Sequence, residues 1–126
     1  MTKTPVNTHK APKPIGAYSQ AIKAGNMVFL SAQAPLVPET MEVVQGGVEA
    51  QITCAFNNLR AVAEASGGSF ANVVKVTVYL TDLANFAFVN ETMIKLFPEP
   101  YPARATVGVK SLPKGTEFSV EAIMHL

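Results

Sequence analysis

The sequence contains a single cysteine, Cys54, so a disulfide bond within the chain is excluded. Such scarcity of cysteine is typical of reducing compartments, and we expect a cytoplasmic protein. No apolar run reaches the roughly 18 residues that a membrane-spanning helix needs. The first residues also lack the apolar core of a signal peptide. We therefore expect neither secretion nor a membrane partner.

Charge is also scarce. Charged residues make up 15% of the 126 residues, and the formal net charge is +1. Lysine and arginine are scattered singly, which argues against nucleic-acid binding, because that function needs a clustered basic surface. The apolar fraction of 48% argues against disorder. The low charge is compatible with oligomerisation, because buried subunit contacts are depleted in charged residues.

Recognisable cofactor and metal motifs are missing. Two histidines and one cysteine give no metal-binding spacing. The sequence has no glycine-rich phosphate loop and no serine-nucleophile elbow. If the protein is an enzyme, we expect it to bind its substrate, polarise it and deliver water, without a metal or cofactor.

Hydrophobic periodicity predicts the order β-β-(β)-α-β-α-β-β. Residues 1–14 hold three prolines and no periodicity, and we interpret them as a lead-in segment of a single domain over residues 1–126. The expected strands cover residues 17–22, 27–31, 41–44, 73–80, 103–109 and 117–124, and the expected helices cover 48–65 and 83–97. Two helices on one face of a mixed sheet make an α+β layer architecture.

The signals for these elements differ in kind. In the first helix, the apolar face is formed by Val48, Ile52, Ala55, Phe56, Leu59 and Val62, and the polar face by Glu49, Gln51, Asn57, Asn58 and Arg60. Ser66-Gly67-Gly68 is a helix end. Asp82 is placed to cap the second helix and Pro98 to stop it. In strand 73–80, Lys75, Thr77 and Tyr79 alternate with Val74, Val76 and Val78.

Arg104 and Glu121 are the first candidate site residues. Each lies in a strongly alternating strand, and a hairpin about Leu112-Pro113 would bring both to one face of the sheet. They are either a cross-strand ion pair, worth roughly 0.2–1 kcal/mol, or a site. In a site, the arginine would bind a carboxylate through two parallel hydrogen bonds, and the glutamate would orient or deprotonate a water. The pattern alone leaves both interpretations open.

Asn90 is the second clue. It interrupts an apolar stripe formed by Phe86, Met93 and Phe97 on the second helix. A buried amide must find hydrogen-bond partners. It either binds a backbone group or lines a ligand pocket. Tyr18 and Ser31 lie in the first hairpin, where such residues are usually structural. Cys54 is interpreted as a small buried apolar side chain.

Several segments together resemble one known family. They run in family order from about residue 8 to the C-terminus, and they are 14–21 (PIGAYSQA), 29–33 (FLSAQ), 49–51 (EAQ), 72–82 (NVVKVTVYLTD), 88–90 (FVN), 102–105 (PARA), 112–115 (LPKG) and 121–123 (EAI). Each is weak alone, and the PARA and EAI segments are the most specific. In combination the chain resembles the RidA (YjgF-type) reactive-intermediate deaminase family.

The resemblance implies a chorismate-mutase-like α+β subunit that assembles as a homotrimer around a central β-barrel. It implies ligand clefts between subunits, each lined by two chains. It also implies an enzyme without cofactors that hydrolyses 2-iminobutanoate and 2-iminopropanoate, released by pyridoxal-phosphate dehydratases, to 2-keto acids and ammonia.

Carried over by position, Arg104 matches the family's substrate-carboxylate anchor and Glu121 the residue that holds the attacking water. Tyr18, Ser31 and Asn90 match cleft-lining positions, and the backbone at Arg104 and Thr106 would orient the substrate.

Three departures from the family pattern stand out. Ala32 takes the place of the usual glycine, where its methyl group would narrow the cleft or change the loop. Thr106 replaces a frequent cysteine of similar size, and Ala105 replaces a common serine expected to face away from the pocket. Ala32 therefore bears most directly on substrate choice.

The sequence leaves rival functions open. A regulatory trimer without turnover would bind 2-keto or short carboxylic acids in the same cleft. An RNA-acting protein is a further alternative, since some relatives carry ribonuclease labels, but the weak charge counts against it. A holdase-like chaperone has no sequence feature that would test it.

Overall fold

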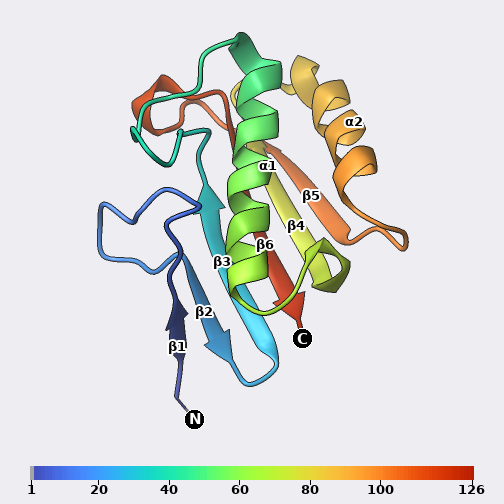
Figure 1. Ribbon diagram of the computed structural model, residues 1–126. Coiled ribbons are helices and arrows are strands. Elements are labelled where there is room, and N and C mark those ends of the chain that lie inside the picture. The colour runs from blue at the N-terminus through green and yellow to red at the C-terminus, as the bar shows by residue number, and fades with distance from the viewer. Residues whose placement is uncertain (1) are drawn as a thin grey trace.

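The computed structural model describes residues 2–126 as one mixed sheet with two helices on the same face (Figure 1). The sheet order is β1-β2-β3-β6-β4-β5. The strands are β1 (Thr4–Val6), β2 (Ala21–Ala24), β3 (Met27–Gln33), β4 (Val73–Leu80), β5 (Ala103–Gly108) and β6 (Phe118–His125), and the helices are α1 (Gly47–Ala65) and α2 (Phe86–Leu96). The predicted α+β layer architecture is confirmed.

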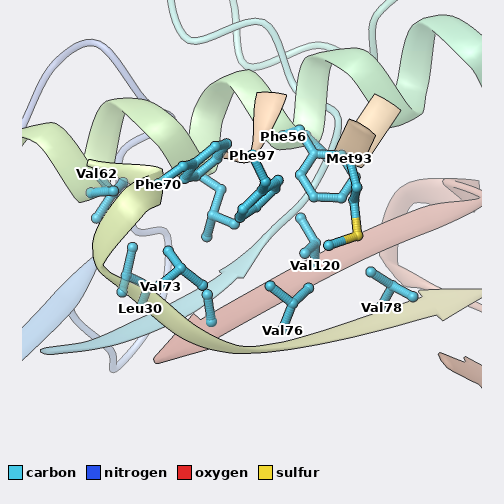
Figure 2. Close-up of a cluster of buried hydrophobic side chains, with 14 of the residues drawn as sticks. Leu30, Phe56, Val62, Phe70, Val73, Val76, Val78, Met93, Phe97 and Val120 are labelled. Carbon is cyan, nitrogen blue, oxygen red and sulfur yellow. The ribbon is translucent and has the colours of Figure 1, made fainter. Parts of the chain in front are cut away.

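The core lies between the helices and the covered face of the sheet, which we call the helix face (Figure 2). Phe56 of α1 is fully buried, and its ring meets Phe97 edge-on at 5.9 Å and Phe118 at 5.5 Å between centroids. Phe70 stacks on Phe97 at 4.1 Å. These rings join α1, the end of α2 and β6, so burial of aromatic area fixes both helices on the sheet.

The opposite face of the sheet, which we call the open face, has no helix over it (Figure 1). Alternation along β4 assigns side chains to the two faces. Val76 and Val78 are buried on the helix face, and Thr77 and Tyr79 are partly exposed on the open face. Val74, expected beside Val76, is instead exposed, because a β-bulge shifts the β4–β6 register between Val73 and Lys75.

The expected hairpin between the last two strands is wrong. β5 pairs only with β4, in parallel, after the chain has crossed over through α2, and β6 pairs antiparallel with both β3 and β4. A helix between two strands returns the chain to the same end of the sheet, which favours parallel pairing. β4 therefore separates β5 from β6 throughout the sheet.

Two smaller expectations near the cavity described below also fail. The segment 41–44 forms no strand but one isolated bridge, Leu36 to Val43, because Met41 has a left-handed φ of 63° that interrupts extended backbone. The strand expected over residues 17–22 begins only at Ala21. Conversely, β1 lies inside the lead-in segment, where no strand was expected.

The helix signals hold with one correction. Asp82 caps as predicted, accepting from the Ala84 amide at 2.9 Å, although it caps a short 3₁₀ turn that precedes α2. In α1, Gln51 and Asn58 were assigned to the polar face but are buried. Asn58 donates to the carbonyls of Ala34 and Leu36 at 3.1 and 2.9 Å, so its amide fixes the loop after β3.

In the described part of the chain, no helix combines the length and the apolar character that crossing a membrane requires.

Candidate functional site

Arg104 lies on β5 and its guanidinium is held by α2. Register places Arg104 beside Val76 on the helix face. Its Nη1 donates to Asn90 Oδ1 at 3.0 Å and approaches Met93 Sδ at 3.6 Å, and its central carbon lies 4.7 Å from the centroid of the Phe86 ring. Cation–π contact and an amide therefore orient an exposed guanidinium.

The engagement of one nitrogen leaves most of the arginine's donors available. Among the described residues, neither Nε nor Nη2 of Arg104 has a side-chain or backbone acceptor. This edge of the guanidinium can form two parallel hydrogen bonds with a carboxylate. A small hollow of about 230 Å³ borders Arg104, with Met93, Ile94, Tyr101 and Pro102 as its other walls.

Glu121 lies on β6 and projects from the open face. Its cross-strand neighbour is Thr77, and its Oε1 accepts a hydrogen bond from the hydroxyl of Tyr79. This hydrogen bond raises the pKa of the Tyr79 phenol, with smaller contributions from burial and from the negative charge of Glu121. The tyrosine therefore stays protonated and remains a donor at neutral pH.

A cavity of about 520 Å³, which we call the Glu121 cavity, opens beside these two side chains. Its walls are mainly apolar and come from the lead-in segment, the loop after β3 and the segment before β6. They include Pro12, Ile15, Tyr18, Ala32, Leu36, Met41, Tyr79, Leu112, Pro113 and Glu121. A carboxylate at the edge of a largely apolar cavity is a common arrangement in small-molecule sites.

Hydrogen bonds from the Gln20 amide and the Lys114 ammonium group hold segments that surround this cavity. Gln20, which is buried, accepts from the Thr8 amide at 2.7 Å and donates to the Pro12 carbonyl at 3.0 Å, so it fixes the lead-in segment. Lys114 donates to the Met41 carbonyl at 3.1 Å and ties the two loops together. Both Lys114 and Met41 have left-handed φ angles, of 60° and 63°. Backbone strain of this kind concentrates at functional sites.

Tyr18 and Ser31 lie close to Glu121. These residues border a second hollow of about 610 Å³ on the open face, together with Phe29. Ser31 donates to the Ser19 carbonyl at 2.6 Å, so its hydroxyl joins the segment before β2 to β3. Tyr18 is half-exposed and borders both hollows.

Ala32 fits the backbone without strain. A one-residue bulge in β3 between Leu30 and Gln33 exposes Ala32 and directs it to the wall of the Glu121 cavity. In the described chain, the non-glycine residues with positive φ are Met41 and Lys114, so Ala32 needs no glycine-like conformation. Its methyl group lies on the cavity wall.

Arg104 and Glu121 do not share a face, contrary to expectation. Arg104 pairs with Val76 and Glu121 with Thr77, which are successive residues of β4 and point to opposite sides of the sheet. Asn90 and Thr106 belong with Arg104, whereas Tyr18, Ser31 and Ala32 belong with Glu121. One chain thus presents two groups of candidate site residues, which we call half-sites, on opposite faces of the sheet.

The side-chain oxygen of Asn90 accepts its hydrogen bond from Arg104 Nη1. The sequence pattern did not indicate this contact, because the two residues are fourteen positions apart on different elements. Tyr79 was missed as a site residue, although its alternation with the valines of β4 had placed it on the same face as Thr77. The missing information was the β4–β6 register, which brings it to Glu121.

Within residues 2–126, no group of three or more histidine, cysteine, aspartate or glutamate side chains is arranged to hold a metal ion.

Comparison with known proteins identifies a family. The family described as Endoribonuclease L-PSP matches residues 8–126. A 2-iminobutanoate/2-iminopropanoate deaminase of Dermatophagoides farinae is 42% identical over 119 residues, covering 94% of this chain and 93% of the relative.

Solved structures agree with the sequence comparison. RidA from the Antarctic bacterium Psychrobacter is 47% identical with a TM-score of 0.94, covering 98% of this chain and 99% of its own. TdcF of E. coli, crystallised with bound serine, is 37% identical with a TM-score of 0.92, covering 98% of each chain. A family match over nearly the whole chain, with identities well above those at which folds diverge, establishes that this chain belongs to the RidA (YjgF-type) family.

Proposed function

We propose that this protein hydrolyses 2-iminobutanoate and 2-iminopropanoate to the corresponding 2-keto acids and ammonia. The observation that carries the proposal is the pair of half-sites: a guanidinium with a free bidentate edge, and a carboxylate bordering an apolar cavity. The deaminase from Dermatophagoides farinae, which is similar over almost its whole length, supports this reaction.

The chemistry uses each half-site once. Arg104 binds the substrate carboxylate through its Nε and Nη2 edge. Glu121 accepts a proton from water as the water oxygen bonds to the imine carbon, and it passes this proton to the imine nitrogen, which gives a neutral carbinolamine. The carbinolamine hydroxyl then gives its proton to the nitrogen through the same carboxylate, so that ammonia leaves while the carbon–oxygen double bond forms. The reaction consumes one water and changes no oxidation state.

Each active site needs two chains. A three- or four-carbon imino acid cannot reach through a sheet, so Arg104 and Glu121 of one chain cannot act on one molecule. In our proposal, a homotrimer with a central barrel brings the arginine half-site of one subunit to the Glu121 cavity of the next. Tyr18, Ser31 and Ala32 then line the cleft from one side, and Asn90 and Thr106 from the other.

The first test is hydrolysis in a coupled assay. A pyridoxal-phosphate threonine dehydratase generates 2-iminobutanoate, and the appearance of the keto acid is followed with and without this protein. We expect acceleration by the unaltered protein and a loss of at least about 100-fold in kcat/KM in Arg104→Ala, because the carboxylate anchor is gone.

Arg60→Ala is the matched control. It removes the same side chain from α1, where Arg60 bonds only to Asn57 at 3.1 Å among the described residues, and it should leave turnover unchanged. Full activity in a folded Arg104→Ala variant would eliminate the proposed mechanism. Glu121→Gln should slow hydrolysis and retain part of the affinity for 2-ketobutyrate.

A regulatory trimer that binds short carboxylic acids is the second candidate. The bound serine of the relative TdcF favours it. Saturable 2-ketobutyrate binding by calorimetry, without any acceleration of imine hydrolysis, would select this function. Cleavage of RNA that persists in Arg104→Ala after rigorous nuclease removal would instead select the activity in the family's description.

A further inference from the structure

Tyr79 and Glu121 are diagonal neighbours on the open face. In the antiparallel pair of β4 and β6, Tyr79 lies opposite Ser119, and Glu121 lies opposite Thr77 two residues further along. Diagonal neighbours are within reach of aromatic side chains. The Tyr79 hydroxyl donates to Glu121 Oε1, and both side chains border the same cavity.

The hydrogen bond restrains a side chain that would otherwise be mobile. A glutamate has three rotatable torsions, and an ionised carboxylate offers two acceptor oxygens. Among the described residues, Tyr79 is the one side-chain hydrogen-bond partner of Glu121. With Oε1 engaged, Oε2 is the oxygen left to hold a water in the cavity.

The phenol of Tyr79 is suited to restrain the Glu121 carboxylate. Its raised pKa, caused first by the bond to Glu121, keeps it a donor throughout the neutral range. The ring lines the cavity together with its mainly apolar walls. A cross-strand pair with a purely structural role would form the same bond, so kinetics must separate the two roles.

We propose that Tyr79 is a positioning residue for hydrolysis: its hydroxyl fixes the Glu121 carboxylate so that Oε2 holds the attacking water in the cavity. This inference rests on the proposed imine hydrolysis. It adds a residue whose effect is on the placement of the water and not on the binding of the substrate carboxylate.

The test compares Tyr79→Phe with Thr77→Val in the coupled imine assay. Each change removes one hydroxyl from the open face of β4, but only Tyr79 is bonded to Glu121. In Tyr79→Phe, kcat should fall by about 10- to 100-fold while KM stays within about twofold, because misplacement of a reacting group has effects of this size. Thr77→Val should retain both constants.

The outcomes separate the inference from the proposed function. No hydrolysis by the unaltered protein overturns both. Normal hydrolysis with an unchanged kcat in Tyr79→Phe overturns only the inference, as does an equal loss in Thr77→Val. A rise in KM without a fall in kcat also contradicts it, because this would assign the hydroxyl to substrate binding.

A titration provides a readout that does not depend on a folded Tyr79 variant. The chain has three tyrosines, and their ionisation is followed by absorbance. In Glu121→Gln, Tyr79 should titrate at lower pH than in the unaltered protein, because the negative acceptor is removed. An identical titration curve would contradict the Tyr79–Glu121 bond on which the inference depends.

Discussion

Asn90 holds the guanidinium of Arg104 in the orientation that our proposal needs for carboxylate binding. The amide oxygen fixes one guanidinium nitrogen at 3.0 Å, and the Phe86 ring supports the plane of the group. A guanidinium held in place loses less conformational freedom when a carboxylate binds. The sequence identified Asn90 because an amide interrupted an apolar stripe, but no local pattern indicated that its partner would be an arginine on another element.

Replacement of Asn90 by alanine tests this support. We expect KM for the imine to rise by about three- to tenfold, with kcat little changed, because an exposed hydrogen bond to a charged group is lost. Steady-state kinetics in the coupled assay measures both constants. Thr92→Ala on the same helix, which removes only a bond to the Phe88 carbonyl, is the control and should keep the original KM.

Cys54 is only partly buried, in contrast to the buried apolar side chain that the sequence suggested. Partial burial raises the pKa of its thiol, an effect partly offset by a hydrogen bond with Asn58. At pH 8, few folded molecules carry the thiolate, so alkylation should be slow in the native protein and fast in urea. Rapid native-state alkylation would contradict the raised pKa of the thiol.

The same shift predicts a pH dependence of stability. The pKa of Cys54 in the folded protein lies above the ordinary value of 9.0. Its contribution to the free energy of unfolding is therefore complete below about pH 9 and is lost as the pH rises through the folded pKa. Urea unfolding at pH 8 and pH 10 should therefore show that the free energy of unfolding falls more with pH in the unaltered protein than in Cys54→Ala.

At the scale of elements, α1 holds the layers together through Phe56. Its ring contacts Phe97 and Phe118, which belong to the end of α2 and to β6. Phe56→Ala should lower the free energy of unfolding by about 3–5 kcal/mol, the usual cost of removing a buried aromatic ring. Chemical denaturation provides the measurement. Ile94→Ala, at a position that is 56% exposed on α2, should change stability by less than about 0.5 kcal/mol.

Local patterns predicted elements better than their pairing. The periodicity of α1 and the β-branched run of β4 determine those elements from neighbouring residues alone, and both were found where expected. The partner of β5 depends instead on the crossover through α2, which places β4 between β5 and β6. The short turn at Leu112-Pro113 resembled a hairpin connection, but non-local pairing took precedence.

The same limitation affected the candidate site. Tyr18, Ser31 and Glu121 were predicted individually and lie together on the open face. Arg104 was predicted as well, yet a hairpin would have brought it to the same face. The sequence therefore indicated which residues are candidates for the site. The face of the sheet on which each one lies depends on strand pairing and register, which the sequence pattern did not predict.

At the scale of the whole molecule, the open face has exposed apolar side chains that a second chain could cover. Phe29 is 47% exposed and Val107 38% exposed on a face that no helix covers. Exposed apolar side chains on an uncovered sheet favour association. The proposed trimer would cover this face and unite the arginine half-site with the Glu121 cavity. Light scattering of the purified protein should therefore give a mass near three times that of one chain.

The central claim is that each active site combines Arg104 of one chain with Glu121 of another, and subunit mixing tests it most directly. Arg104→Ala and Glu121→Gln, each nearly inactive alone, are unfolded together in equal amounts and refolded. Random assembly gives about one quarter of the sites both native groups, so about a quarter of the unaltered activity should return. Trimers that reassemble with no recovered activity would contradict the two-chain site.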